Sequence, residues 1–315
     1  MEDKIKEIIE REFNAQVLEI KRITEGYSHY MYLVKINKDP KEVIIRFSNN
    51  KKEDVGLGKE KFIIELLRKN NIPAPKIYSF NGEYMVLEKF NGIRLDIIWD
   101  SLTKQEKIQI TKEIGKLLSK IHSIKFEKFG KIESEGKIKA DEAFNFRKVG
   151  EKPEHDPYIR QYLIDIFDDC ARLLSYPHIS KEFMEKIISY YIRNLGKIDY
   201  NGKATLVHAD FMTGHIFVEK IGDEYKITGI IDFEFARSHA PEYDFIKLHR
   251  QGFFDDEEIK QALKDSYGDI NEQAVEFHRL TRDLGFAWAM VESGNKKLSD
   301  EKLKELEEKL DNLKR

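Results

Sequence analysis

The sequence predicts an α+β fold with two lobes, a small β-rich N-terminal lobe and a larger helical C-terminal lobe. Runs with strand character, separated by turn residues, fill much of residues 17–90, whereas amphipathic helical patterns dominate after residue 94. A chain of 315 residues, 41% of them hydrophobic, is long and apolar enough to bury two sizeable cores. We place the N-terminal lobe at residues 1–91 and the C-terminal lobe at residues 92–315.

The N-terminal lobe is predicted to start with a three-stranded meander. The strand runs cover residues 17–23, 30–36 and 42–47. The turn between the first two contains Gly26 and Ser28, whose backbone N–H groups and hydroxyl could lie over phosphates. A single glycine is a weak signal of such a loop.

The third predicted strand carries one basic residue, Arg46, and a helix is predicted to follow at residues 59–70. Glu60 lies near the start of this helix and is available to pair with Arg46. The alternative is an edge arginine and an ordinary acidic residue favoured by the helix dipole. Two more strands are predicted around the Asn81-Gly82 hairpin signal, at residues 76–80 and 84–90.

The C-terminal lobe is predicted to be mainly helical. Thr103 and Glu106 form a capping box that opens a long amphipathic helix ending at His122, which we interpret as a packing residue. Residues 126–156 show little periodicity and are predicted to form a mobile connection or an inserted substrate-side loop. Further helices are predicted at residues 157–174, 180–195, 257–267, 272–290 and 299–313.

The segments 206–218 and 230–234 contain the candidate catalytic and metal-binding residues. Short strand runs at 205–207 and 216–218, with a returning strand at 226–231, predict that Asp210, His215 and Asp232 converge at one edge of a small sheet. Transfer of a phosphoryl group requires positioning, charge neutralisation by a metal and one group that orients the attacking hydroxyl. Taken singly, each residue could instead belong to a turn network or cap a helix.

In order and spacing, His208, Asp210, His215 and the segment 231–234 resemble the catalytic and metal motifs of the aminoglycoside phosphotransferase family. The resemblance implies a bilobal protein-kinase-like fold, shared with choline kinases and more distantly with protein kinases. Most members have Asn where this chain has His215; the histidine resembles the 2''-aminoglycoside and macrolide branches, and Glu234 resembles the choline kinases. His208 is interpreted as a scaffold residue.

The resemblance implies roles for the converging residues. Asp210 would accept or orient the proton of the substrate hydroxyl, and His215 and Asp232 would hold Mg²⁺ bridging the nucleotide phosphates. An acid after the metal motif, Asp244, would tie the catalytic loop to the following helix.

Nucleotide binding is predicted at the N-terminal lobe and the connection that follows it. By resemblance, Arg46 would bind phosphate with Glu60 as its partner, and the base would bind the backbone of Glu88 and Phe90, with Ser28 over the phosphates. No side chain there selects between ATP and GTP, so both are retained as donors.

The favoured acceptor is an aminoglycoside or a similar amine-bearing alcohol, which would imply antibiotic resistance. Asp255, Asp256 and Glu292 are candidate substrate-binding acids, with Asp283 as a further one. An acidic run at a helix start is also favoured by the helix dipole without any ligand. The alternatives are a metabolic kinase for choline, a sugar or homoserine, or a nucleotide-binding regulator without turnover.

Composition argues against other classes of function. The net charge of −3 predicts neither a nucleic-acid binder nor attraction to an anionic membrane. Cys170 is the only cysteine, so no intramolecular disulfide or multi-cysteine zinc site can form. There is no apolar signal segment or membrane-length run, which predicts a cytoplasmic protein. The oligomeric state does not follow from the sequence.

Overall fold

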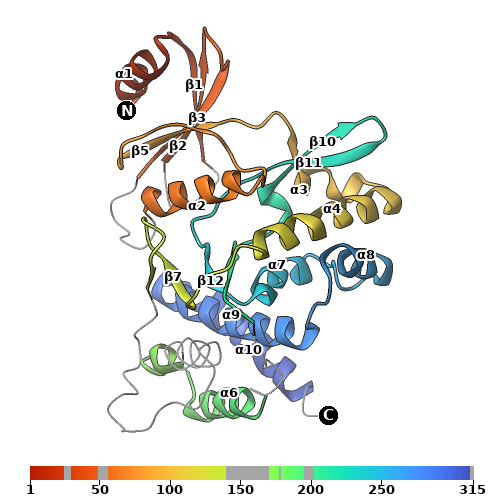
Figure 1. The fold of residues 1–315 in the computed structure, drawn as a ribbon. Coiled ribbons are helices and arrows are strands. Elements are labelled where there is room, and N and C mark those ends of the chain that lie inside the picture. The colour runs from red at the N-terminus through yellow and green to blue at the C-terminus, as the bar shows by residue number, and fades with distance from the viewer. Residues whose placement is uncertain (25–29, 49–55, 140–169, 177–178, 195–201, 313–315) are drawn as a thin grey trace.

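The structure is a computed structural model, and it describes residues 1–24, 30–48, 56–139, 170–176, 179–194 and 202–312. It confirms the predicted fold class, with an antiparallel sheet in the N-terminal part and mostly helices in the C-terminal part (Figure 1). The predicted lobe boundary after residue 91 lies between β5, which ends at Glu88, and the short strand β6, Ile93–Arg94. The division into lobes stays a prediction.

The N-terminal sheet has five strands in the order β1-β2-β3-β5-β4, and all its neighbours are antiparallel. The predicted meander is confirmed. Helix α1, Glu2–Phe13, packs against this sheet through Ile5, Ile8 and Ile9. The strands are β1 (Val17–Ile23), β2 (Tyr30–Ile36), β3 (Glu42–Phe47), β4 (Ile77–Phe80) and β5 (Tyr84–Glu88).

Strand β3 shows how the sequence directs one charged side chain toward the site. Alternate residues of a strand point to opposite faces, and Val43 and Ile45 lie in the core shared with α1. Arg46 therefore lies on the other face, where helix α2, Leu57–Lys69, supplies Glu60. One face of the sheet is thus closed by apolar packing, and the other presents a charge.

The catalytic part begins with β6 and the short helices α3, Leu95–Ile98, and η1, Trp99–Ser101. Helix α4, Lys104–His122, follows, and its predicted capping box is confirmed. The Thr103 N–H donates to Glu106 Oε2 at 3.0 Å, and the Glu106 N–H donates to Thr103 Oγ1 at 3.3 Å. The buried face of α4 forms the core with α2 and the site strands.

The predicted irregular connection at residues 126–156 is wrong for its first part. Residues 130–139 contain β7, Gly130–Ile132, and β8, Ile138–Lys139, which join β9 and β12 in a sheet of order β8-β7-β12-β9. Strands of two or three residues show no periodicity, so pairing with distant β12 decides their structure. Residues 140–156 lie outside the described part. The other two strands are β9 (Thr205–Val207) and β12 (Arg237–His239).

The C-terminal helices pack into a second core that includes α6, α9 and α10. The predicted helix at 257–267 has the observed bounds of α8, and the other predicted ends differ by three residues or fewer. Of the predicted helix 157–174, only 170–174 lie in the described part, and they are helical. The helices are α6 (Lys181–Asn194), η5 (Pro241–Asp244), α7 (Phe245–Arg250), α8 (Glu257–Tyr267), α9 (Glu272–Glu292) and α10 (Lys296–Asn312).

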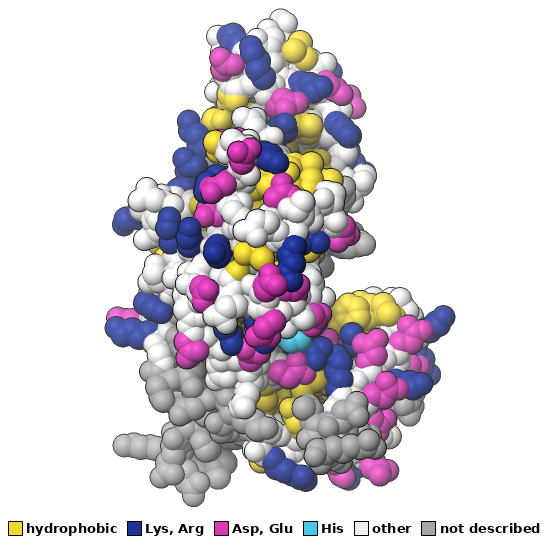
Figure 2. Space-filling model, turned by 90° about the vertical axis from the view of Figure 1, so that its right-hand side faces the viewer, with side chains coloured by type: hydrophobic (Ala, Val, Ile, Leu, Met, Phe, Trp, Pro, Cys, Tyr) yellow, Lys and Arg dark blue, Asp and Glu magenta, His cyan; other side chains and the backbone are white. Residues whose placement is uncertain are grey.

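Charged side chains of both signs are interspersed over the face drawn in Figure 2, in agreement with the small net charge. Cys170 is buried. Among the helices of the described residues, none combines the length and the apolar character needed to cross a bilayer.

Two histidines are buried against each other in the C-terminal part. The rings of His239 and His278 have centroids 5.6 Å apart, and neither side chain is exposed. Burial, reinforced by the charge of Arg237, lowers the pKa of His278 from 6.5 to about 3. His278 is therefore neutral in the folded protein at any pH at which the fold is expected to persist.

We expect this histidine to make the fold sensitive to acid. Between pH 6.5 and about 3 the unfolded chain binds a proton at His278 that the folded chain does not, so stability falls as pH falls. The loss at pH 5 should be about 2 kcal/mol relative to pH 8. Urea unfolding of wild type and His278→Gln at both pH values measures it. A wild-type pH dependence no steeper than that of the variant would contradict the assignment.

Candidate active site

The predicted convergence of the three polar residues is confirmed by strand pairing. Strand β10, Ile216–Ile221, pairs with β11, Glu224–Ile230, so that Ile216 lies opposite Ile230. The Ile231 N–H also donates to the His215 carbonyl at 3.0 Å. His215, which precedes Ile216, and Asp232, which follows Ile231, are thereby brought together, and His215 Nε2 lies 3.4 Å from Asp232 Oδ2.

Asp244 anchors the loop that carries Asp210. One of its carboxylate oxygens accepts the His208 N–H at 2.8 Å and the other accepts the Ala209 N–H at 2.7 Å. The Nε2 atom of His122 lies 3.0 Å from the same carboxylate, which is buried. These contacts confirm the structural role predicted for Asp244, and they give His122 a polar partner in addition to its packing. Ala209 is held at φ 64°, a left-handed conformation that costs a non-glycine residue energy.

His208 is fixed as a neutral scaffold residue, as predicted. Its Nε2 lies 2.9 Å from the Ile231 carbonyl, which can only accept, so this nitrogen carries the proton. Its Nδ1 then accepts the Asp210 N–H at 3.3 Å. Burial is the main cause that lowers the pKa of His208, in agreement with a neutral ring that holds Asp210 in place.

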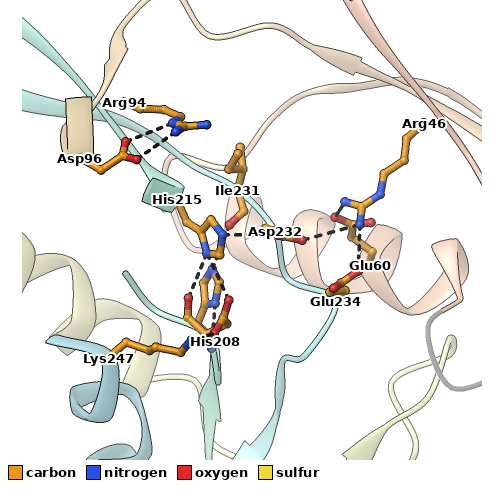
Figure 3. A network of polar contacts seen from close by, with 11 residues as sticks. Arg46, Glu60, Arg94, Asp96, His208, His215, Ile231, Asp232, Glu234 and Lys247 are labelled. Carbon is orange, nitrogen blue, oxygen red and sulfur yellow. Dashed lines mark hydrogen bonds and ion pairs between the residues drawn. The ribbon is translucent and has the colours of Figure 1, made fainter. Parts of the chain in front are cut away.

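The second histidine presents a lone pair toward a carboxylate. His215 Nδ1 lies 2.9 Å from the Asp210 carbonyl and must donate to it. In a neutral ring, Nε2 is therefore an acceptor, and it faces Asp232 Oδ2 at 3.4 Å. Two acceptors facing each other require a positive charge between them, either a proton on the imidazole or a cation. Figure 3 shows His215 and Asp232 turned toward one another.

Asp210 forms an ion pair with a lysine of helix α7. Lys247 Nζ lies 3.0 Å from Asp210 Oδ1. Burial alone would raise the pKa of Asp210, but the charge and hydrogen bond of Lys247 outweigh it, and the pKa lies below its ordinary value. Asp210 is therefore an ionised carboxylate held on one side by a cation.

Arg46 is surrounded by three carboxylates. Its Nη1 donates to Glu60 Oε1 at 2.6 Å, which confirms the predicted pair, and its Nη2 lies 3.3 Å from Glu234 and 3.6 Å from Asp232. Figure 3 shows these residues as one network beside His215. Lys59 Nζ donates to the Glu234 carbonyl at 2.8 Å. Three carboxylates and two cations, Arg46 and Lys59, therefore form one network, with Arg237 and Lys131 close enough to act on Lys59.

Burial modifies the ionisation of two of these groups. Glu60 is enclosed between sheet and helix, and this burial raises its pKa to about 7 despite the opposing charge of Arg46. Burial also lowers the pKa of Lys59 to about 8, reinforced by Arg237 and Lys131. Both groups therefore titrate close to neutral pH, so binding of a charged ligand here would change the protonation of Glu60 and Lys59.

A cavity of about 520 Å³ opens beside this network. Its lining combines apolar side chains of the N-terminal sheet and of the segments around β10 with Arg46, Glu60, His215, Asp232 and Glu234. This volume and this mixture of one polar edge and apolar walls are typical of small-molecule sites. Among the apolar lining residues are Ile23, Ile44, Leu87, Phe90 and Phe217.

Two glycines allow the segment between β5 and β6 to lie tightly against the β10-β11 hairpin. A Cβ on Gly92 would lie 2.7 Å from the Val218 carbonyl oxygen. A Cβ on Gly229 would lie 2.4 Å from the ring of Phe90, which lines the cavity. The position of Phe90 therefore depends on the absence of a side chain at residue 229.

We expect Gly229→Ala to disturb the cavity, whereas Gly56→Ala should not. The new methyl group must displace the Phe90 ring, at a cost of about 1–3 kcal/mol. A Cβ at Gly56 meets nothing within 4 Å, so this variant is the matched control. Thermal unfolding and nucleotide titration of both variants measure the effect. Equal stability and equal affinity in the two variants would contradict the packing argument.

The remaining predicted site residues lie in different surroundings. Ser28 lies outside the described residues. Glu88 lines the cavity, but its N–H already donates to the Lys76 carbonyl at 2.8 Å, so a base could bind only its carbonyl. Asp256 caps helix α8 and pairs with Lys104 at 3.0 Å, as in the helix-start alternative. Of Asp255, Asp256 and Glu292, none is among the residues that line the cavity. Their role in substrate binding stays a prediction.

Sequence reasoning missed three participants. Glu234 was noted only for its resemblance, although its carboxylate contacts Arg46. Lys247 gave no signal, since helix α7 is six residues long and was not predicted. Gln251 was also missed: its side chain accepts the Thr213 N–H at 3.2 Å and donates to Thr213 Oγ1 at 2.8 Å. The spacing of Lys247, three residues after Asp244, could have indicated a side chain one turn beyond the loop anchor.

The order and geometry of these residues agree with a comparison against protein families. The model of the phosphotransferase enzyme family matches residues 19–289. The chain belongs to this family. It is therefore a small-molecule phosphotransferase with an alcohol group as acceptor, and the resemblance inferred from its motifs is confirmed. A search of curated proteins finds no match.

Solved structures with the same fold include other phosphotransferases. The ternary complex of APH(2'')-IIa with streptomycin and ATP has a TM-score of 0.67 and 14% identity, and the match covers 98% of this chain and 96% of that chain. Macrolide 2'-phosphotransferase type I has a TM-score of 0.64 and 13% identity, with 97% and 96% covered. A proposed fructosamine-3-kinase from Thermobifida fusca has a TM-score of 0.64 and 12% identity, with 96% and 98% covered. At these identities, the similarity shows a common fold.

Proposed function

We propose that this phosphotransferase transfers the γ-phosphoryl group of ATP or GTP to a hydroxyl of a small molecule, with Mg²⁺. The convergence of Asp210, His215 and Asp232 beside the cavity is the observation that carries the proposal. Asp210 would accept the hydroxyl proton, since it is an ionised carboxylate anchored through its own loop. Lys247 would hold that carboxylate in place.

The residues present fit a divalent cation. Asp232 and His215 direct two acceptors at one point, and the Asp232 and Glu234 carboxylates beside Arg46 would repel a polyphosphate that came without a cation. Among the described residues no cluster of three or more His, Cys, Asp or Glu side chains could hold a metal. Mg²⁺ uses one or two protein carboxylates together with substrate phosphates, and Asp232 would be such a carboxylate. The ion would neutralise phosphate charge during transfer.

The donor would occupy the 520 Å³ cavity. Its phosphates would meet Arg46, whose planar guanidinium can bind two oxygens and is kept in position by Glu60. Its base would lie among apolar side chains near Phe90, with backbone of Glu88 and Phe90 as partners. The nucleotides named in the neighbouring structures, ATP among them, support this assignment.

Two acceptor classes are proposed. The family resemblance and the streptomycin complex of a structural neighbour support an aminoglycoside-like acceptor, and with it a role in antibiotic resistance. A metabolic acceptor such as a sugar or homoserine is the second candidate. A specific observation favours it: the described side chains next to Asp210 on the α7 and α9 side are the cations Lys247 and Arg282.

The proposal is tested by nucleoside diphosphate release from the purified protein with Mg²⁺. ATP and GTP are used in turn against aminoglycosides, macrolides, choline, sugars and amino alcohols. Acceptor-dependent release names the substrate class. Nucleotide binding without release for any acceptor would instead favour a regulator that keeps the fold without turnover.

A further inference from the structure

The acceptor must approach Asp210 from the side opposite the cavity. The cavity lining reaches His215 and Asp232 but does not include Asp210 or Lys247. In-line transfer places the attacking hydroxyl beyond the γ-phosphate, between it and the carboxylate that orients it. The rest of the acceptor therefore extends toward helices α7 and α9. In Figure 3, Lys247 and Arg46 lie on opposite sides of His215.

Two cations lie on that side. Lys247 follows Tyr243 by four residues, about one helical turn, and Tyr243 binds Arg282 of helix α9. Arg282 Nη1 donates to the Tyr243 hydroxyl at 3.3 Å, and its Cζ lies 5.6 Å from the centroid of the Tyr243 ring. Tyr243 packs with Val207 and Ala209 directly beneath the catalytic loop. Tyr243 thus places Lys247 and Arg282 in the same region, because it lies about one helical turn before Lys247 and contacts Arg282.

Arg282 differs from the nearby arginines Arg279 and Arg250, each of which forms an ion pair with a carboxylate. Arg279 pairs with Glu276 at 2.5 Å, and Arg250 pairs with Asp283 at 2.5 Å. Among the described residues, Tyr243 makes both the hydrogen bond and the ring contact of Arg282, and the Asp210 carboxylate acts on Arg282 from a longer distance. Of the side chains that the structure describes, none forms an ion pair with this partly buried guanidinium, although the more distant Asp210 charge acts on it, so its donors can serve an anion of the ligand. Asp283, a candidate for binding amines, is itself buried and already contacted by Arg250, Lys302 and Lys309.

We propose that Arg282 and Lys247 together bind an anionic group of the acceptor, a carboxylate or a phosphate. This inference rests on the proposed function, because it places the acceptor by the position of Asp210. Arg282 can present two parallel N–H groups to such an anion, and Lys247 has three donors, of which Asp210 takes one. The acceptor is then an acidic hydroxyl compound, whereas an aminoglycoside would bring its amines against two cations.

The inference is tested with acceptors that share a carbon skeleton and differ in charge. Gluconate, glucose 6-phosphate, glucose and glucosamine are titrated by calorimetry into protein loaded with Mg²⁺ and a non-hydrolysable ATP or GTP analogue, and kanamycin is added to the series. We expect at least one of the two anions to bind ~10-fold or more tightly than glucose, and glucosamine and kanamycin to bind no better than glucose. Comparison of gluconate with glucose 6-phosphate shows whether the site prefers a carboxylate or a phosphate.

Variants assign the preference to the two cations. Arg282→Gln and Lys247→Gln should each abolish it, while Arg282→Lys should keep part of it. Tyr243→Phe, which keeps the ring but removes the hydroxyl bonded to Arg282, should also keep part of it. Arg193→Gln, a charge loss at an exposed position of α6, is the matched control and should have no effect. Arg282→Lys keeps the test informative if Arg282→Gln does not fold.

Several results would overturn the inference. They are equal binding of all sugars, tighter binding of glucosamine or kanamycin, no measurable binding of either anion, or a preference that survives Arg282→Gln. Failure of the proposed function is distinguishable, because it would appear separately, either as failure to bind ATP and GTP or as nucleotide binding without diphosphate release for any acceptor.

Discussion

Replacing Asp210 by Asn is expected to lower the rate of acceptor-dependent nucleoside diphosphate release by about 100-fold or more. The amide has nearly the same shape but cannot accept the hydroxyl proton, and it no longer attracts Lys247. Nucleotide affinity should change little, because Asp210 does not line the cavity. The rate is followed by diphosphate release at saturating nucleotide, and the affinity by direct titration.

Asp223→Asn is the matched control for this substitution. Asp223 is exposed in the turn between β10 and β11, so the same chemical change there should leave the rate unaltered. An Asp210→Asn protein that keeps a rate near that of wild type would refute the base assignment. A variant that loses nucleotide binding would instead indicate that Asp210 acts through the fold of the loop.

Replacing Arg46 by Met is expected to destabilise the protein by about 3–5 kcal/mol, because it leaves a buried Glu60 without its partner. The loss should depend on pH. Burial already raises the pKa of Glu60 to about 7, and removal of the guanidinium raises it further. The folded variant then holds a proton that the unfolded chain releases above pH 4.5, so the variant loses stability as pH rises from 4.5 through the raised folded pKa.

Denaturant unfolding at pH 6 and pH 8 measures both effects. The double variant Arg46→Met/Glu60→Gln should recover part of the loss, since no buried charge is left at residue 60. Lys61→Met breaks a more exposed pair with Glu65 on the same helix and should cost under about 1 kcal/mol. A cost for Arg46→Met no larger than that of Lys61→Met would contradict the role of Arg46 in the fold. Nucleotide affinity should also fall if Arg46 binds phosphate.

The elements that could be predicted from the sequence are those whose signal is local. The strands at 17–23, 30–36 and 42–47 are runs of strand-forming residues separated by turn residues. Thr103 and Glu106 form a capping box that can be recognised from the residue types and their spacing. Strand β12 and helix α7 could not be predicted in the same way. Each is short, and each exists because distant partners, β7 and β9 for β12, pair with or pack against it.

The same distinction applies to the site. Asp210, His215 and Asp232 follow or precede short apolar strands, so their convergence follows from hairpin geometry. The contact of Glu234 with Arg46 joins residues 188 positions apart, and the ion pair of Lys247 with Asp210 depends on how α7 docks. Neither contact could be identified from the charges in the sequence, since a chain with 54 basic and 57 acidic residues offers many possible ion pairs. Tertiary packing selects among them.

The Asp244 carboxylate joins regions that are far apart along the chain, with His122 at a separation of 122 residues and His208 at a separation of 36. Contacts of such long range form slowly, because the intervening chain must be ordered before they contribute. The loop that carries Asp210 should therefore reach its working geometry only in the last stage of refolding. Regain of catalytic turnover after dilution from denaturant would then lag behind the recovery of helical circular dichroism, and enzyme assays would report the fraction of molecules with fully native topology.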